Sequence, residues 1–509
     1  MVLTPMSAGS TSTIAASADS AIPSAPVPAR VDQRGAVALL LLAIAMGGLL
    51  RFANLGGSEM SADEGASWAA ARAPSVSGVL ELQPKLNPGK FAIHELALHG
   101  WIRLFGEELT SMRALSAFAG TLAIVAVFLV ARELFALDQA LRCGAPAKND
   151  ADERRRLMLA AFAAILFAVN LVFIKYAQEA RMYSVALLAA LMQVEFFLRS
   201  LRRAAPVWLV LTALFTAIAI ATTFTMCLIL PPEAIWLTYL GRHSDPALRR
   251  RTVLAGVTLM GGIALLIGPA IIYLDAREHE PPLITYAWAS RPPLWAPLSM
   301  FNKATGSVAF PISMALALWG LIRAWNRERD AIVFLLLWML VPPILVLFAS
   351  YLIRPAFVER YMLASFVPFF LLVAVGSWRA DGRLTQYALV TLLTAVALGH
   401  LYSYRQHPHD VQWREALQTA NAAGGQTILV APPYAADVLR YYSRESRNNS
   451  LVEANPTARA AVAIVGDSGV SRTQSALISS AFPRLLAQLR GVIVRAHQIK
   501  GFKHGRTIH

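Results

Sequence analysis

The stretch RGAVALLLLAIAMGGLLRFANLGGSEMSADE, residues 34–64, decides the fold class of this chain. Its first half is an apolar run between Arg34 and Arg51, whose long side chains can reach the two faces of a bilayer. Its second half leaves the apolar run and reaches the acidic pair Asp63–Glu64. The stretch therefore predicts a membrane-spanning helix that places two carboxylates at a membrane surface.

Apolar runs of similar length recur through the rest of the chain. Of the 509 residues, 56% are hydrophobic and 15% are charged, whereas soluble domains carry about a quarter charged residues. Runs of about 18 residues with few charges are typical of transmembrane helices. We therefore expect a polytopic α-helical membrane protein with about eleven spans. The expected spans are 35–50, 113–131, 158–174, 183–198, 206–222, 224–240, 253–273, 306–322, 331–350, 361–377 and 384–402.

The net charge of +15 lies mostly in the short connections between apolar runs. Basic residues in such connections mark the cytoplasmic side of a membrane protein. With the N-terminus in the cytoplasm, every inner connection contributes Arg or Lys. The segments 51–112, 175–181, 274–305 and 351–360, and everything after residue 402, then face outward. A nucleic-acid partner is not expected, because no basic patch is interleaved with exposed aromatic residues on a soluble domain.

Three parts of the chain differ in composition. Residues 1–33 are rich in Ala, Ser, Pro and Thr without periodicity, which predicts a disordered cytoplasmic tail. Residues 34–404 form the expected transmembrane domain, with 51–112 as its first outer loop. Residues 405–509 alternate helical and β patterns, which predicts a small extracytoplasmic α/β domain. These patterns are a helix at 413–423, a strand at 426–430, a helix at 435–442 and a strand at 460–465.

The residues that most often bind metals form no convincing set. Cys143 falls in a polar loop and Cys227 in an apolar run, so neither a disulfide nor a cysteine metal site is expected. His94 and His99 are five residues apart with Glu95 between them, an awkward spacing for one helix face, and no third ligand is evident. We expect no cofactor, with a divalent metal left open as the alternative.

Four outward segments place ionisable residues beside membrane boundaries. Their carboxylates could act as a base, and their Arg and Lys groups could hold a phosphate at the bilayer surface. The alternative is ordinary loop solvation, with long side chains reaching the interface. The segments are Ser61–Glu64, Asn87–Lys90, Lys175–Tyr183 and Arg354–Tyr361.

Several motifs, spread over about residues 35–445, together form a family pattern. They are Arg51, Asp63–Glu64, Asn87–Pro88, Leu98–Gly106, Arg113–Ala117, Tyr176–Tyr183, Arg360–Tyr361 and Trp413–Glu415. With them the chain resembles the family 39 glycosyltransferases. This group includes the protein O-mannosyltransferases and the aminoarabinose transferases that modify lipid A.

The resemblance implies the C-type glycosyltransferase fold, a multi-helix membrane bundle with an extracytoplasmic active site. Such enzymes move a sugar from a polyprenyl-phosphate carrier to an acceptor, and the resemblance assigns Asp63 to the acidic position implicated in catalysis. The chain departs from the family's His-Pro-Pro pattern, because Asn87–Pro88–Gly89 lacks the His and the second Pro. The role of that segment is therefore open, although Lys90 could still reach a phosphate.

Seven residues are candidates for the site. Asp63 is interpreted as the catalytic base, against loop solvation or a helix N-cap, and Glu64 as a residue that positions the acceptor, against solvated exposure. The alternatives for the two arginines are interface anchoring or ion pairs of Arg181 with Glu179 and of Arg360 with Glu359. The candidates for substrate binding are Lys90, Lys175, Glu179, Arg181 and Arg360.

The function that follows is sugar transfer at the outer face of the inner membrane. Nucleotide sugars are made in the cytoplasm, so an outward site favours a lipid-linked donor, and direct attack by the acceptor would invert the anomeric carbon. The expected partners are the polyprenyl-phosphate sugar, a lipid, glycan or protein acceptor, and membrane lipids. Two alternatives stay open: a non-enzymatic transporter or flippase for lipid-linked sugars, and a polymerase or ligase of whole glycans. A transporter would place ionisable groups near the bilayer midplane.

Overall fold

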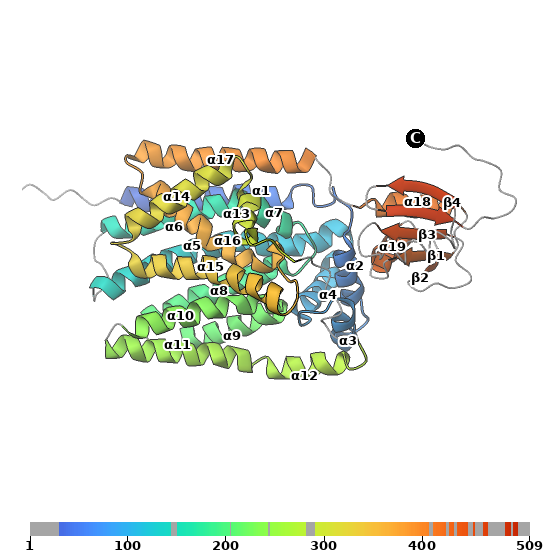
Figure 1. Cartoon of the computed structure of the whole chain (residues 1–509), viewed down its shortest axis with the longest axis horizontal. Helices are drawn as coiled ribbons and strands as arrows, with labels where there is room; N and C mark the ends of the chain where they lie inside the picture. The colour runs from blue at the N-terminus through green and yellow to red at the C-terminus, as the bar shows by residue number, and fades with distance from the viewer. Residues whose placement is uncertain are drawn as a thin grey trace, which may run out of the picture.

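The structure, a computed structural model, consists of a long helical bundle and a small C-terminal sheet (Figure 1). Most of the expected tail at 1–33 lies outside the described residues, which start at residue 30. The described residues are 30–143, 150–203, 205–242, 245–280, 291–406, 411–423, 427–431, 435–445, 451–453, 462–466, 484–489 and 492–496.

Helices make up the bundle and the segment at one of its ends. The bundle contains α1 (Arg30–Phe52), α5 (Leu109–Cys143), α6 (Asp150–Val169), α7 (Leu171–Ala177), α8 (Tyr183–Arg202), α9 (Pro206–Thr222), η1 (Phe224–Ile229), α10 (Leu230–Gly241), α11 (Pro246–Ala264), α12 (Ile267–Ala276), α13 (Ala296–Thr305), α14 (Ala309–Ala324), α15 (Arg329–Leu352), η3 (Glu359–Met362), α16 (Leu363–Trp378) and α17 (Arg383–Gln406). The end segment between α1 and α5 contains α2 (Ala62–Ala71), α3 (Val76–Leu86) and α4 (Ile93–Phe105).

Eight helices of the described residues are long and apolar enough to cross a membrane, or up to ten if each bent pair is one span. The pairs are α6 with α7, bent by 60°, and α13 with α14, bent by 110°. The shorter apolar α9 occupies the remaining expected span. Large apolar side chains such as Leu49, Ile322 and Phe348 are exposed, as in a protein surrounded by lipid. A polytopic α-helical membrane protein is thus confirmed, while the number of spans stays a prediction.

Helix α16 forms the centre of the bundle. Its residues from Leu363 to Ser377 are all buried, against α6, α14 and α15. It crosses α14 so closely that a Cβ on Gly376 would lie 1.9 Å from the carbonyl oxygen of Leu316. Small residues permit such a close backbone approach, which is a common source of helix association in membranes.

The bend between α6 and α7 directs the chain toward the α2 end of the bundle. Asn170 caps α7 by accepting a hydrogen bond from the Val172 amide at 3.0 Å. The last carbonyls of α6 lose their helical partners at this bend, and the buried Arg51 side chain donates to the Ala168 oxygen at 2.8 Å. After the bend, α7 leads into the 178–182 connection, which carries Arg181.

The C-terminal region contains a five-stranded sheet in the order β2-β1-β3-β5-β4. Strand β1 is parallel to β2 and β3, whereas β5 is antiparallel to β3 and β4. The α18 and α19 side chains share a core with the strand residues Ile428, Ile464 and Val494. The predicted C-terminal α/β region is therefore present. Its elements are α18 (Trp413–Ala422), β1 (Thr427–Ala431), α19 (Ala436–Glu445), β2 (Leu451–Glu453), β3 (Val462–Gly466), β4 (Arg484–Leu489) and β5 (Val492–Ala496).

Candidate active site

The acidic pair lies in the first turn of α2. Ser61 caps this helix: its hydroxyl accepts a hydrogen bond from the Glu64 amide at 3.2 Å, and the Glu64 carboxylate accepts one from the Ser61 amide at 2.9 Å. This reciprocal capping box fixes the helix start. Asp63 therefore projects from an ordered turn.

Asp63 lies between two guanidinium groups from distant parts of the chain. Its Oδ2 atom is 3.6 Å from Arg181 Nη2 and 3.7 Å from Arg360 Nη1. Both distances exceed hydrogen-bond length, so these are ion-pair contacts. Asp63 Oδ1 has no partner among the described residues, and the side chain is 48% exposed. The site therefore presents a carboxylate oxygen to solvent beside two cations.

Glu64 is buried and fully engaged, unlike Asp63. Arg113 Nε donates to Glu64 Oε1 at 2.8 Å, and Arg113 Nη2 donates to Oε2 at 2.9 Å. The Ala180 amide adds a bond to Oε1 at 2.7 Å. This geometry favours Glu64 as an anchor between α2, α5 and the 178–182 connection over direct contact with an acceptor. The remaining Arg113 bonds are to the loop oxygens of Leu55, Ser58 and Glu59.

A second buried network connects Lys90 to Arg181. The Lys90 ammonium, 1% exposed, donates to Glu95 Oε1, which also accepts from the Ser67 hydroxyl at 3.0 Å. Arg181 Nη1 donates to the same hydroxyl at 3.1 Å and to the backbone oxygen of Asp63 at 2.8 Å. Lys90 is thus held close to the Asp63 site through Glu95 and Ser67.

The other candidate residues lie at the margin of this site. Lys175 lies over the rings of Tyr176, at 5.4 Å, and Tyr404, at 6.0 Å. Glu179 is partly exposed, and its backbone oxygen accepts a bond from the Arg181 amide at 2.7 Å. The structure therefore brings Asp63, Arg181 and Arg360 into direct contact, but not Lys175.

Two ion pairs considered from the sequence have other partners in the structure. Arg181 pairs with Asp63 and not with Glu179, and the Glu359 carboxylate pairs with Lys303. Arg360 pairs with Asp63, and its guanidinium also lies 5.8 Å from the centre of the Tyr361 ring.

The charges around the site shift several pKa values. Arg181, and less strongly Arg360, lower the pKa of Asp63 below its ordinary value, against the opposing effect of burial. Burial raises the pKa of Glu64, but Arg113 and the backbone amides of Ser61 and Ala180 outweigh burial, so the pKa lies below its ordinary value. Asp63 and Glu64 are therefore both ionised at neutral pH.

Two groups titrate near neutrality. Burial lowers the pKa of Lys90 to about 8, although the Glu95 carboxylate opposes the shift. Burial, together with the negative charge of Glu64, raises the pKa of Glu179 to about 7. The charge of the site therefore changes between about pH 6 and pH 9 without any change at Asp63.

His94 and His99, which were considered as metal ligands, lie close to other groups of the chain. His99 Nδ1 lies 2.7 Å from the Ala71 carbonyl oxygen, which only accepts, so this nitrogen carries the proton. His94 Nδ1 lies 3.4 Å from Glu95 Oε1. Within the described ranges, no group of three or more His, Cys, Asp or Glu residues could hold a metal ion.

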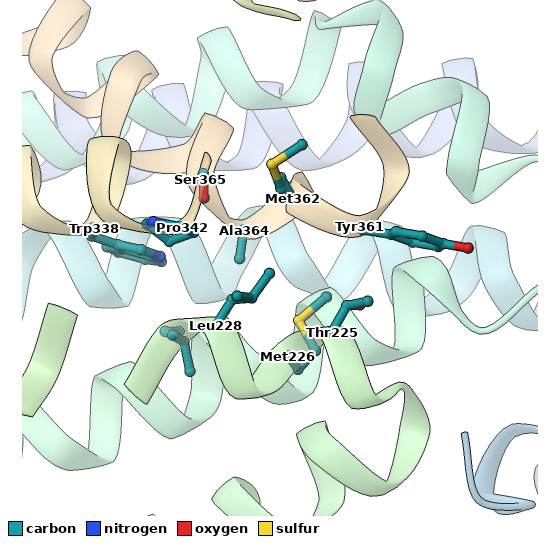
Figure 2. A pocket seen from close by; sticks show the side chains of 10 residues that line it. Thr225, Met226, Leu228, Trp338, Pro342, Tyr361, Met362, Ala364 and Ser365 are labelled. Carbon is teal, nitrogen blue, oxygen red and sulfur yellow. The ribbon is translucent and has the colours of Figure 1, made fainter. Parts of the chain in front are cut away.

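An apolar pocket lies between η1, α15 and the start of α16, next to the site (Figure 2). Its cavity volume is about 10 Å³. Tyr361, the neighbour of Arg360, lines one end of the pocket, and Trp338 lines the other. The other lining residues are Thr225, Met226, Leu228, Ile229, Pro342, Met362, Ala364 and Ser365.

Three residues of the site were not among the candidates for catalysis or binding: Arg113, Ser67 and Glu95. Arg113 entered only through the Arg113–Ala117 motif. Its position at the start of an apolar run was a usable signal, because a charge there needs a partner. The Ser-x-x-Glu signature of residues 61–64 could likewise have indicated a capping box and an anchoring role for Glu64. Nothing in the local sequence indicated Ser67.

Comparisons with known proteins agree with this architecture. The family model described as the protein O-mannosyl-transferase TMEM260 N-terminal domain matches residues 98–247. The crystal structure of ArnT from Cupriavidus metallidurans bound to undecaprenyl phosphate is similar with a TM-score of 0.57 and 14% sequence identity, covering 93% of this chain and 99% of that one. The apo structure of ArnT from the same organism gives a TM-score of 0.58 and 13% identity, covering 91% of this chain and 98% of that one.

Among curated proteins, no match is found for the sequence. The likeness to the ArnT structures extends over nearly the whole chain, the C-terminal region included. The arrangement of the helices and the similarity to the ArnT structures lead to the same fold. This chain is a multi-pass membrane protein with the C-type glycosyltransferase fold.

Proposed function

We propose that this chain transfers a sugar from a polyprenyl-phosphate carrier to an acceptor at the extracytoplasmic face of the inner membrane, with inversion. The observation that carries the proposal is Asp63, a half-exposed carboxylate with one open oxygen between Arg181 and Arg360. Sugar transfer needs a base for the acceptor hydroxyl and cations for the leaving phosphate. This cluster supplies both groups at one place.

The reaction follows from the positions of these groups. Asp63 accepts the proton of the acceptor hydroxyl as the acceptor oxygen forms its bond to the anomeric carbon. The bond from that carbon to the phosphate oxygen breaks on the opposite face, and the polyprenyl phosphate leaves with the electron pair. Arg181 and Arg360 stabilise the charge that develops on the leaving phosphate.

Donor binding prepares Asp63 for its role. In the free protein the two guanidiniums lower the pKa of Asp63, which makes it a weak base. A phosphate bound between them compensates their charge, so the pKa of Asp63 rises toward its ordinary value. Proton acceptance is then favoured only when the donor is present.

The apolar pocket supports a lipid-linked donor. It starts at Tyr361, directly beside Arg360, and extends between helices to Trp338 (Figure 2). A polyprenyl chain is apolar and gains free energy when its first units leave water. The phosphate would lie at Arg181 and Arg360, with Lys90, Lys175 and Glu179 around it, and the tail would follow the apolar residues between Tyr361 and Trp338 as these helices move apart.

The charge distribution supports an outward-facing site. The helices α2 to α4 and the C-terminal sheet lie at one end of the bundle (Figure 1). The connections at the other end carry clusters of basic residues, which mark a cytoplasmic face. A reporter fused after residue 404 is therefore expected to be extracytoplasmic, as measured by accessibility to a membrane-impermeant reagent in intact cells. A cytoplasmic reporter would contradict this orientation.

A transporter is the less favoured alternative. Of the buried carboxylates within the helices, Glu195 pairs with Arg199, and Glu233 accepts one bond from Gln193 at 3.1 Å, while the second oxygen of each has no hydrogen-bond partner among the described residues. The open carboxylate and the cations instead gather at one end of the bundle, where chemistry on a lipid headgroup takes place.

Removing either phosphate-binding arginine is expected to weaken donor binding. Arg360→Met and Arg181→Met should each raise the Kd for a polyprenyl-phosphate sugar about 10- to 100-fold, because each removes a charge-assisted contact of about 1.5–3 kcal/mol. Binding is measured by titration in detergent. Arg103→Met is the matched control, since Arg103 is exposed on α4 and donates to the Pro74 oxygen. Unchanged donor affinity in both variants would exclude the phosphate site.

Donor affinity is expected to fall in two steps between about pH 6 and pH 9. The donor is a phosphodiester of constant charge, so the steps belong to the protein. Glu179, with its pKa near 7, becomes negative as pH rises and repels the phosphate. Lys90 then loses its positive charge above about pH 8. Glu179→Gln should remove the first step only and Lys90→Met the second only, whereas a flat profile in the unmodified protein contradicts both assignments.

A further inference from the structure

Helix α19 of the C-terminal region packs directly on α2, the helix that carries Asp63. The ring of Trp68 on α2 meets the ring of Tyr441 on α19 edge to face, with centroids 5.3 Å apart. The Tyr442 hydroxyl accepts a hydrogen bond from the Met60 amide at 2.7 Å. Met60 directly precedes the N-cap of α2, so this bond fixes the point where α2 begins.

Gly65 allows the two helices to touch at backbone distance. A Cβ at this position would lie 2.7 Å from Val438 Cγ2 and 2.8 Å from the Val438 backbone nitrogen. Real Cβ atoms essentially never come this close, so any side chain at residue 65 would push α19 and α2 apart. Gly65 follows the acidic pair directly, and the tightest contact with α19 therefore lies within one turn of Asp63.

Polar contacts hold both ends of α2 to the same region. Before the helix, Glu59 Oε2 accepts a bond from the Arg414 amide of α18 at 2.9 Å. In its last turns, Trp68 Nε1 of α2 donates to Glu107 of the connection between α4 and α5 at 3.3 Å, and Glu107 pairs with Arg444 of α19 at 2.9 Å. The C-terminal region thus contacts the start and the middle of α2 directly and its end through Glu107.

We propose that α19 is a positioning element for the catalytic carboxylate, with Gly65 and Tyr442 as positioning residues. The bundle holds one side of α2 through the bond between Glu64 and Arg113, and α19 holds the other side. The C-terminal region then serves the chemical step itself, because the place of Asp63 is set by both contacts. This proposal rests on the proposed function for the role of Asp63.

The donor site should depend less on α19 than the base does. Arg181 lies in the 178–182 connection and Arg360 in η3, and both elements belong to the bundle. A small displacement of α2 would move the base itself, whereas at the donor site it would disturb the bonds of Arg181 to the Asp63 oxygen and the Ser67 hydroxyl and leave η3 in place. An error of about 1 Å in the position of a catalytic group can cost about 100-fold in rate.

The test compares Gly65→Ala with Gly100→Ala in the full-length protein. Gly100 is an exposed helical residue of the same end segment, with nothing within 4 Å of an added Cβ. Turnover at saturating donor is expected to fall about 10- to 100-fold in Gly65→Ala and to stay unchanged in the control. The Kd for the donor should rise by a smaller factor than the loss of turnover in Gly65→Ala, because Arg181 also bonds to α2, and it should stay unchanged in the control. Amide hydrogen exchange over residues 58–71 should increase in Gly65→Ala alone.

A milder variant covers the case that Gly65→Ala does not fold. Tyr442→Phe removes only the hydroxyl that binds the Met60 amide, and it should lower turnover by a larger factor than donor affinity, with faster exchange at residues 58–71. Unaltered turnover or exchange in the folded variants, or an equal loss of donor affinity, overturns the proposal. Suppose that Asp63→Asn is active and that Gly65→Ala still shows faster exchange. This result would overturn the catalytic role of Asp63, while the contact of α19 with α2 would still be supported.

Discussion

Asp63→Asn abolishes sugar transfer, with turnover expected to fall by about 10²–10⁴-fold. The amide is similar in size to the carboxylate but cannot accept the proton of the acceptor hydroxyl. Donor affinity should stay the same or increase, because the negative charge that competes for Arg181 and Arg360 in the free protein is gone. Lower turnover together with equal or higher donor affinity is the result expected for a base that lies between the phosphate-binding groups.

The measurement is single-turnover transfer in proteoliposomes that contain a polyprenyl-phosphate sugar, together with a donor titration. Glu81→Gln is the matched control, because Glu81 is an exposed carboxylate of the same end segment, paired with Lys85 at 2.9 Å. Near-normal transfer by folded Asp63→Asn protein would remove Asp63 from the mechanism.

Arg113→Met is expected to cause the largest loss of stability of any single change at the site. The variant leaves the buried Glu64 carboxylate without its cationic partner. Removing one partner of a buried ion pair lowers the free energy of unfolding by about 3–5 kcal/mol. The variant also frees the loop oxygens that Arg113 binds before α2. Asp63 would then lose its fixed position even where the protein still folds.

This loss is measured as the decrease in the unfolding free energy in detergent. Arg414→Met is the control, because Arg414 and Glu445 form an ion pair in which both side chains are about half exposed, and such pairs contribute about 0–1 kcal/mol. The double variant Arg113→Met with Glu64→Gln should be less destabilised than the sum of the two single variants, since the unpaired charge is removed. Full additivity would show that the pair is not coupled.

Hydropathy was sufficient to predict most of the bundle. Each expected span coincides with an apolar helix, because a bilayer demands a minimum length of apolar helix wherever the chain crosses it. In the C-terminal region the helices and the strands β1 and β3 matched their patterns, but β2, β4 and β5 were not predicted. Strand β2 has only three residues, and the pairing of β2 with β1, of β5 with β3 and of β4 with β5 depends on contacts that no local pattern records.

The site was predictable in its residue types but not in its pairing. Asp63, Arg181 and Arg360 could be chosen because each lies in a family motif at a helix end that is expected to face outward, yet their neighbours in sequence suggested other ion pairs. Those pairs did not form, because the bend after α6 and the folding of η3 bring both arginines to α2. Lys90 was expected at a phosphate, but its ammonium is held by Glu95, a residue that the sequence did not single out.

The bond between Met60 and Tyr442 joins residues 382 positions apart, which determines when the site can form. Contacts between distant residues form late in folding, because the loss of chain entropy must be offset before they contribute stability. Synthesis proceeds from the N-terminus, so α2 emerges long before α19 exists. Until the last part of the chain has been synthesised and translocated, the base has no fixed place, and a nascent or truncated chain could bind the lipid carrier without consuming it.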